Sequence, residues 1–240
     1  MPFIDHLAEL RTRLAISLGS IAVLAGISFI WATQLFAILT RPLVDGVDKQ
    51  VNLIGTGPAE AFIVKLKVAL GAGIVLAAPI LFYQLWKFVA PGLLDKEKRY
   101  ALPFVVFTSF FFLLGISFCY NFVLPFAFDF FLDEFLSIGV SPDIRIGEYL
   151  TFTLRILLVF GLVFELPILS FFGAVLGIVS STWLREKGRM AVVVIFVCAA
   201  ILTPPDVVTQ CLLAVPLIIL YLLCIWIAAR VEKHRKTSEN

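Results

Sequence analysis

The sequence predicts an all-α membrane protein with six membrane-spanning helices, and three observations support that prediction. Apolar residues make up 61% of the 240 residues, and the mean hydropathy is +1.03, whereas soluble domains are about 45–50% apolar. The apolar residues form long runs instead of alternating with polar ones. Lys and Arg gather in every second connection between those runs. No stretch remains for a soluble domain, so we expect one polytopic membrane domain over residues 1–240.

Six apolar runs are candidates for the spans, since a helix needs about 20 apolar residues to cross about 30 Å of hydrocarbon. They cover about residues 14–36, 68–86, 101–124, 150–176, 190–202 and 207–229. The first run is too long for the apolar region of a cleavable signal peptide and lacks a small-residue cleavage motif. The two longest polar stretches, about 37–67 and 125–149, are expected to connect spans on one side of the membrane, and the second of these loops is acidic.

The distribution of Lys and Arg predicts the orientation, because cytoplasmic loops carry an excess of these residues. An even number of spans places both termini on one side. That side would carry Arg11, Arg13, Lys87, Lys96, Lys98, Arg99, Arg185, Lys187, Arg189, Arg230, Lys233, Arg235 and Lys236. The opposite side would carry only Arg41, Lys49, Lys65, Lys67 and Arg145, while Arg155 falls inside the fourth span. Both termini are therefore predicted to be cytoplasmic.

The fifth span is unusually short. Residues 190–202 would form a helix of about 20 Å, which is roughly 10 Å less than the hydrocarbon thickness. Pro204 and Pro205 follow it and would end the helix, because proline lacks the N–H donor and clashes with the preceding turn. Either the bilayer is thinner here or a partner covers the gap; the alternative is a misplaced boundary.

The N-terminal residues 3–14 have the pattern of an amphipathic helix that leads into the first span and lies at the cytoplasmic surface. Asp5, Glu9 and Arg13 share one face of this helix at steps of four residues. Glu9 could therefore form an intrahelical pair with Arg13, or it could be a surface carboxylate that binds a cationic ligand.

The connection after the second span, residues 87–100, combines charge with apolar surface. Pro91 and Gly92 predict a turn, and charged residues follow at 95–99. Phe88 and Leu93 would lie beside these charges. The run could be no more than a solvated face, but carboxylates flanked by apolar surface also suit a peptide that is basic and then hydrophobic.

Glu165 lies inside the fourth apolar run, where a carboxylate costs roughly 2.5–3.5 kcal/mol to insert and marks a candidate functional site. Arg155 is ten residues earlier, about 15 Å along a helix and on a different face, so the two are not expected to pair. Pro167 could kink the helix beside the acid. Three roles remain open: an acid that is neutral or hydrogen-bonded within the bundle, a proton or ion relay, and a docking point for a polar residue of another helix; we expect the acid to be predominantly neutral.

Several function classes find no support in the sequence. The four cysteines stand singly in apolar stretches, without a CxxC motif, so no metal site or disulfide framework is predicted. There is no phosphate-binding loop motif, and we expect neither a cofactor nor a catalytic site. His6 and His234 lie outside the predicted spans, and no Asp lies within them, which disfavours an intramembrane protease. A net charge of +2 does not suggest a nucleic-acid partner.

Several short motifs occur in order along nearly the whole chain. They are HLAELRTR at residues 6–13, AP at 78–79, YQLWKFVAPGL at 83–93, FELP at 164–167 and TPPD at 203–206, which is followed by Gln210. With these motifs the sequence resembles the TatC family, the multi-spanning receptors of the twin-arginine protein translocase.

This resemblance implies a receptor for signal peptides with two consecutive arginines. In the family, the cytoplasmic N-terminal segment and the first cytoplasmic loop form the binding site, and its acidic contacts fall on Glu9 and Glu97 here. Arg13, Phe88 and Leu93 are lesser candidates. The chemistry is consistent with this, because the planar fork of arginine binds a carboxylate with two parallel hydrogen bonds and lysine cannot do so.

The resemblance also implies a curved, glove-like bundle of six helices with a concave face, short fifth and sixth helices and a location in the cytoplasmic (inner) membrane. Its implied partners are the single-span proteins TatA and TatB, further copies of the chain, and membrane lipid. Residues expected to dock partner helices are Glu165, Gln84, Thr203, Pro204, Pro205, Asp206 and Gln210. The family exports folded proteins using the proton-motive force. A secondary transporter for protons or a small solute, with Glu165 as the coupling residue, is the alternative.

Overall fold

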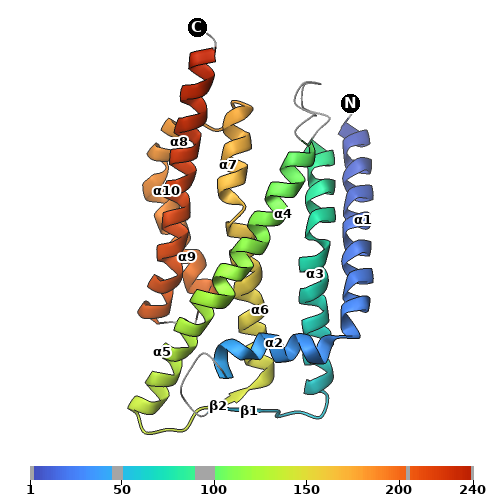
Figure 1. The fold of residues 1–240 in the computed structure, drawn as a ribbon, viewed down its shortest axis with the longest axis vertical. Helices are drawn as coiled ribbons and strands as arrows, with labels where there is room; N and C mark the ends of the chain where they lie inside the picture. Colours follow the sequence, from blue (N-terminus) through green and yellow to red (C-terminus); the bar gives the residue numbers. More distant parts are fainter. Residues whose placement is uncertain (1–2, 45–50, 90–100, 204–205, 239–240) are drawn as a thin grey trace.

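The computed structural model describes residues 3–44, 51–89, 101–203 and 206–238, which are mostly helical. The helices stand roughly upright in a bundle (Figure 1). Helix α1 (Phe3–Phe29) begins and helix α10 (Val207–Ser238) ends at the same end of the bundle, which we call the terminal side. Two short strands, β1 (Asn52–Ile54) and β2 (Asp143–Arg145), lie at the opposite end, which we call the strand side.

Helix α1 is continuous from residue 3 to residue 29, so the expectation of a separate N-terminal helix lying along the membrane surface is wrong. Residues 3–14 form the first turns of the spanning helix itself. Helix α1 packs extensively against α3 (Glu60–Val89), which runs beside it in Figure 1. A turn at Ile30 and Trp31 ends α1, and helix α2 (Ala32–Val44) then crosses the strand side of the bundle.

Two tyrosine hydroxyls fasten α2 to the bundle. Pro42 lies inside α2 and has no N–H, so the carbonyl of Ile38, four residues earlier, loses its helical donor. The hydroxyl of Tyr120 donates to that carbonyl oxygen at 2.7 Å, and the hydroxyl of Tyr149 donates to the oxygen of Leu39 at 2.7 Å. The proline therefore creates an acceptor on which a side chain from another helix docks.

At the strand side, β1 and β2 pair in parallel, and Leu53 lies opposite Ile144. Figure 1 shows these strands below α2.

Helix α4 (Ala101–Phe118) continues through a π-helical turn (Cys119–Val123) into α5 (Leu124–Ser137). Much of the stretch 125–149, expected to be a loop, is thus helical. Its phenylalanines supply the apolar surface, and Pro125 is tolerated because it lies in the first turn of α5.

The fourth span is broken where the sequence places an acid next to a proline. Helix α6 (Ile146–Val163) ends at Phe164, and α7 (Leu166–Val175) begins after Glu165. Pro167 lies in the first turn of α7, where its missing N–H costs no hydrogen bond. The kink expected from Pro167 is confirmed.

The last part of the bundle contains α8 (Ser181–Glu186), α9 (Gly188–Leu202) and α10. Helix α9 has 15 residues, about 22 Å, so the short fifth span is confirmed. The expectation of a short sixth helix is wrong, because α10 has 32 residues. Its apolar part continues without a break into the basic residues after 229. By length and composition, five helical stretches of the described residues could cross a membrane, and α9 is a shorter sixth.

Glycines allow the helices to approach closely at two points. A Cβ atom at Gly73 on α3 would lie 2.6 Å from the backbone nitrogen of Ala25 on α1. A Cβ atom at Gly115 on α4 would lie 2.6 Å from the carbonyl oxygen of Phe160 on α6. The main core gathers buried side chains of α3, the π-helical turn, α5, α6 and α10, among them Val68, Leu124, Ile156, Phe160 and Leu213.

Candidate functional site

At the terminal side, Arg13 joins a carboxylate and a carboxamide from different helices. Its Nη2 atom donates to Oε1 of Glu9 at 3.0 Å, and the two residues are one helical turn apart on α1. Its Nη1 atom donates to Oε1 of Gln84 on α3 at 3.1 Å. Gln84 is buried, so the contact fixes the guanidinium from the inner side. The intrahelical pair expected from the spacing of Glu9 and Arg13 is therefore present.

A hollow of about 220 Å³ lies next to these residues, between α1 and α3. It is lined by Leu10, Arg13, Leu14, Ser17, Leu81, Gln84, Leu85 and Phe88. The structure thus brings together three of the predicted site residues, Arg13, Gln84 and Phe88. Gln84 was grouped with the docking residues in the sequence, but its hydrogen bond goes to Arg13. Leu93 and Glu97 lie outside the described residues.

The side chain of Glu9 is one-fifth exposed, and the part of its carboxylate that faces solvent remains accessible to a ligand. Beside it, the Nε atom of Arg13 is buried and has no hydrogen-bond partner among the described residues. A cationic ligand at Glu9 would compete with Arg13 for the same carboxylate, while Gln84 would still hold Arg13 in place.

Glu165 is a buried acid at the break in the fourth span. Its side chain is buried, with 4% exposure, and neither carboxylate oxygen has a hydrogen-bond partner in the part that the structure describes. It occupies the break between α6 and α7, where its backbone oxygen accepts from the N–H of Leu169 at 2.8 Å. Among the described residues, no donor reaches this carboxyl group, so a hydrogen bond within the bundle is not seen for it.

The turn between α9 and α10 contains the remaining predicted residues. Thr203 donates to the carbonyl of Ala199, and Gln210 donates to the carbonyl of Phe196 at 3.0 Å. Asp206 caps α10, since its carboxylate accepts from both the N–H and the hydroxyl of Thr209. Pro204 and Pro205 lie outside the described residues. These polar side chains shape the turn, and Gln210 ties α10 to α9.

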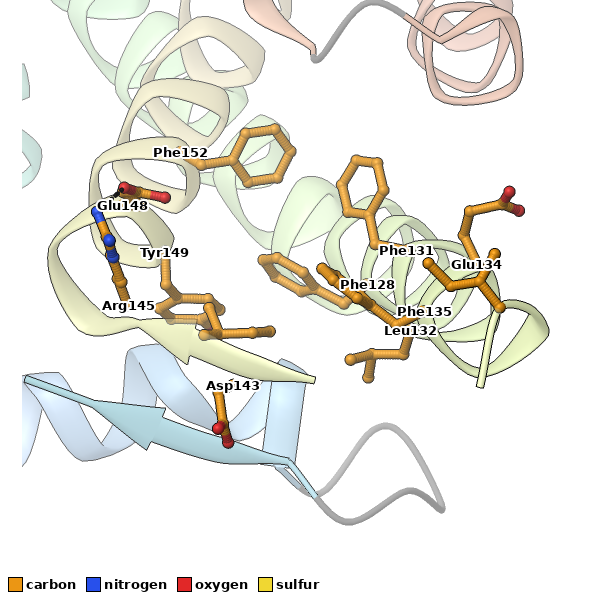
Figure 2. A pocket seen from close by; sticks show the side chains of 12 residues that line it. Phe128, Phe131, Leu132, Glu134, Phe135, Asp143, Arg145, Glu148, Tyr149 and Phe152 are labelled. Atoms are coloured by element: carbon orange, nitrogen blue, oxygen red, sulfur yellow. Dashed lines mark hydrogen bonds and ion pairs between the residues drawn. The ribbon is translucent and has the colours of Figure 1, made fainter. Parts of the chain in front are cut away.

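Sequence reasoning missed two cavities on the strand side. One, of about 530 Å³, is lined by residues of α5, β2 and the start of α6, and Figure 2 shows the aromatic residues Phe128, Phe131 and Tyr149 around it. The other, of about 460 Å³, lies between α3 and α6 and is lined by several charged residues. The close spacing of phenylalanines at 126–135 was the available signal for the first cavity; the second depends on residues from separate helices.

Comparisons with known proteins agree with the motifs. The family model described as Sec-independent protein translocase protein (TatC) matches residues 5–216. This chain belongs to the TatC family. Relatives named Sec-independent protein translocase protein TatC include one from Desulforapulum autotrophicum, which is 45% identical over 100% of this chain and 88% of its own. One from Campylobacter jejuni is 42% identical over 98% of this chain and 96% of its own.

The TatC fold is also shown by a solved structure. A crystal structure titled as the twin arginine translocase receptor TatC matches with a TM-score of 0.86 and 34% identity, covering 94% of this chain and 99% of that one. A second crystal structure, of the same receptor in DDM, matches with a TM-score of 0.83 and 34% identity, covering 92% of this chain and 98% of that one. The chain is thus a multi-pass membrane component of a TatC-type protein translocase, a family of transport proteins and not of catalytic enzymes.

Proposed function

We propose that this protein is the signal-peptide receptor of a twin-arginine translocase, and that the terminal side of its bundle is the cytoplasmic, signal-reading face. The observation that carries this proposal is the placement of Glu9. Its carboxylate lies on the first helix and is bonded to Arg13, which lines a mostly apolar hollow together with Phe88. A twin-arginine signal carries the complementary groups in the same order, since its two guanidinium groups, which suit an acid, are followed by an apolar segment, which suits the hollow.

Glu9 would accept one guanidinium as a forked pair of hydrogen bonds, displacing Arg13 from that carboxylate. Arg13 would keep its bond to Gln84 and would remain partly neutralised by the carboxamide dipole. Glu97 would accept the second guanidinium, and Phe88 and Leu93 would contact the apolar part of the signal. Lysine would bind less well at both positions, because an ammonium group cannot form the planar two-point contact.

The proposal extends to the partners and to the energy source. Glu165 and the turn from Thr203 to Gln210 would dock single-span helices of the TatA and TatB type, and copies of the chain would assemble around them. A polar group of such a helix would supply the hydrogen bond that the buried Glu165 carboxyl group lacks, with a strength of about 0.6–2 kcal/mol. Export of folded proteins would be driven by the proton-motive force across the cytoplasmic membrane. The family assignment favours this function over the solute-transporter alternative.

The decisive experiment is photocrosslinking of a precursor protein to this chain in inverted inner-membrane vesicles. We expect Glu9→Lys and Glu97→Lys each to abolish the crosslink of a twin-arginine precursor placed on the cytoplasmic side. Glu148→Lys is the matched control, because this acid is exposed on the strand side and should leave the crosslink unchanged. A twin-lysine precursor should crosslink weakly to the unaltered chain. Unchanged crosslinking in both Glu9→Lys and Glu97→Lys would contradict the proposal.

A further inference from the structure

The cavity of about 460 Å³ on the strand side carries an unusual set of charges for a site between two membrane helices. Its charged lining residues are Glu60, Lys67, Arg145, Glu148 and Arg155. Helices α3 and α6 supply four of them, and Arg145 ends β2 directly before α6 begins. What the cavity can bind depends on which of these charges are already neutralised within the chain.

The carboxylate of Glu60 is occupied by the protein itself. Its oxygens accept from the backbone N–H groups of Thr56 at 2.5 Å, Gly57 at 3.2 Å and Gly147 at 3.0 Å, and from the hydroxyl of Thr56 at 3.2 Å. The acid thus joins the turn before α3 to the start of α6. With four neutral donors around it, this carboxylate keeps its charge but forms no ion pair with a described cation.

The second acid has a cation of its own. Arg145 donates to Oε1 of Glu148 at 3.4 Å, one turn apart at the start of α6, and the dashed line in Figure 2 marks this pair. Both side chains are well exposed, with 59% and 76% of their surface accessible. The remaining cations of the cavity lining are Lys67, which is half-buried, and Arg155, which is exposed.

Lys67 and Arg155 have no acidic partner in the part of the chain that the structure describes. The Nζ atom of Lys67 donates to the hydroxyl of Thr151 at 2.8 Å, and that hydroxyl donates to the carbonyl of Gly147 at 2.6 Å. Lys67 is thus held in position by a neutral group. Arg155 lines the same cavity one turn beyond Thr151 and forms no ion pair with a described residue. These two positive charges therefore share one cavity, and neither forms an ion pair with a described acid.

Their depth suggests which anion is available. Lys67 directly precedes the apolar run 68–86, and Arg155 lies nine residues after the start of α6, about 14 Å along the helix axis. Long basic side chains at this depth extend toward the membrane surface and keep their charged ends among the lipid headgroups. The anions present at that level of any bilayer are lipid phosphates, and the guanidinium fork is well matched to phosphate oxygens.

We propose that Lys67 and Arg155 bind the phosphate of an anionic lipid in the leaflet on the strand side. A carboxylate of a partner protein is an alternative anion for these two cations, because it carries a negative charge as the lipid phosphate does. However, neither cation forms an ion pair within the described residues of the single chain, and lipid surrounds the protein whether or not a partner is bound. The ammonium group of Lys67, which the hydroxyl of Thr151 holds in position, supplies one positive charge to the phosphate. The guanidinium of Arg155 donates two parallel hydrogen bonds to the phosphate oxygens.

The test is native mass spectrometry of the full chain, purified in detergent and titrated with phosphatidylglycerol or phosphatidylcholine. We expect the unaltered chain to retain phosphatidylglycerol in preference to phosphatidylcholine. The variant Lys67→Gln, Arg155→Gln should lose about tenfold in apparent affinity for phosphatidylglycerol, equivalent to about 1.4 kcal/mol. The matched control is Arg41→Gln, Lys65→Gln, which removes two strand-side cations outside the cavity and should keep the preference. Circular dichroism shows whether each variant remains folded.

Three outcomes would overturn the proposal. Equal retention of phosphatidylglycerol by the double variant and its control would show that these cations do not hold the lipid. Displacement of the lipid by inorganic phosphate at the same concentration would assign the site to a free anion. Absence of lipid preference, combined with photocrosslinking from position 155 to a coexpressed partner helix, would assign the cavity to a protein carboxylate.

Discussion

The guanidinium of Arg13 on α1 donates to the carboxamide of Gln84 on α3 at 3.1 Å. This contact joins residues 71 positions apart and places the Glu9–Arg13 pair against the second span instead of leaving it in solvent. The candidate signal-binding acid is therefore positioned through Arg13 by a residue of another helix.

Gln84→Leu should destabilise the protein by about 1–3 kcal/mol, because it leaves the partly buried Nη1 group of Arg13 without an acceptor. Denaturant titration in detergent micelles measures this loss. Gln84→Glu is the control, since it keeps an acceptor of the same length and should retain the contact with Arg13. Equal stability of Gln84→Leu and the unaltered chain would mean that Arg13 finds another acceptor.

Glu165→Leu should make the isolated chain more stable by about 1–3 kcal/mol, because it removes a buried carboxyl group that has no hydrogen-bond partner among the described residues. The same change should reduce the capture of a coexpressed TatB-type partner. Glu165→Gln, which remains polar, should show neither gain in stability nor complete loss of capture. Lower stability in Glu165→Leu would indicate that the carboxyl group is satisfied within the chain.

Gly73→Ala should destabilise the packing of α1 on α3 by about 1–3 kcal/mol, since its Cβ atom would meet the backbone of Ala25 at 2.6 Å. Gly26→Ala, in the facing helix, is the matched control, because nothing lies within 4 Å of its Cβ position. That control should be neutral or slightly stabilising, as alanine favours helix more than glycine does. The comparison uses unfolding midpoints of the two variants under the same conditions.

Tyr120→Phe should cost about 0.5–1.5 kcal/mol, because it removes the donor to the Ile38 carbonyl that Pro42 leaves open. The cost should become smaller in a Pro42→Ala background, where a backbone N–H again reaches that carbonyl. A double-mutant cycle isolates this coupling from other effects of the two changes. Tyr149→Phe serves as the control, because its acceptor on Leu39 does not depend on Pro42, so its cost should be additive with Pro42→Ala.

The sequence was sufficient for features that depend on local chemistry. Proline after Glu165 predicted the break between α6 and α7, and the short apolar run at 190–202 predicted the short α9. The step of four residues predicted the pair of Glu9 with Arg13. Each of these follows from helical geometry or from the properties of proline. Both act within one segment of the chain and do not depend on the other helices.

Features that depend on tertiary contacts could not be predicted in this way. The role of Gln84 required knowledge that α1 and α3 meet at Arg13, and hydropathy does not report which helices are neighbours. Helix α5 was mistaken for a loop because its acids, Asp129, Asp133 and Glu134, lower the local hydropathy although its phenylalanines pack in the core. The surface helix expected at residues 3–14 failed because an amphipathic pattern also fits the end of a spanning helix.

The close approach of Gly73 to Ala25 has a mechanical consequence for signal recognition. Ala25 lies 16 residues beyond Glu9, so that contact is about 24 Å along α1 from the candidate signal-binding acid. A rotation of α1 about this contact would therefore move its terminal-side end more than its strand-side end. A rotation of about 5° would displace Glu9 by about 2 Å, which is enough to break one hydrogen bond and form another.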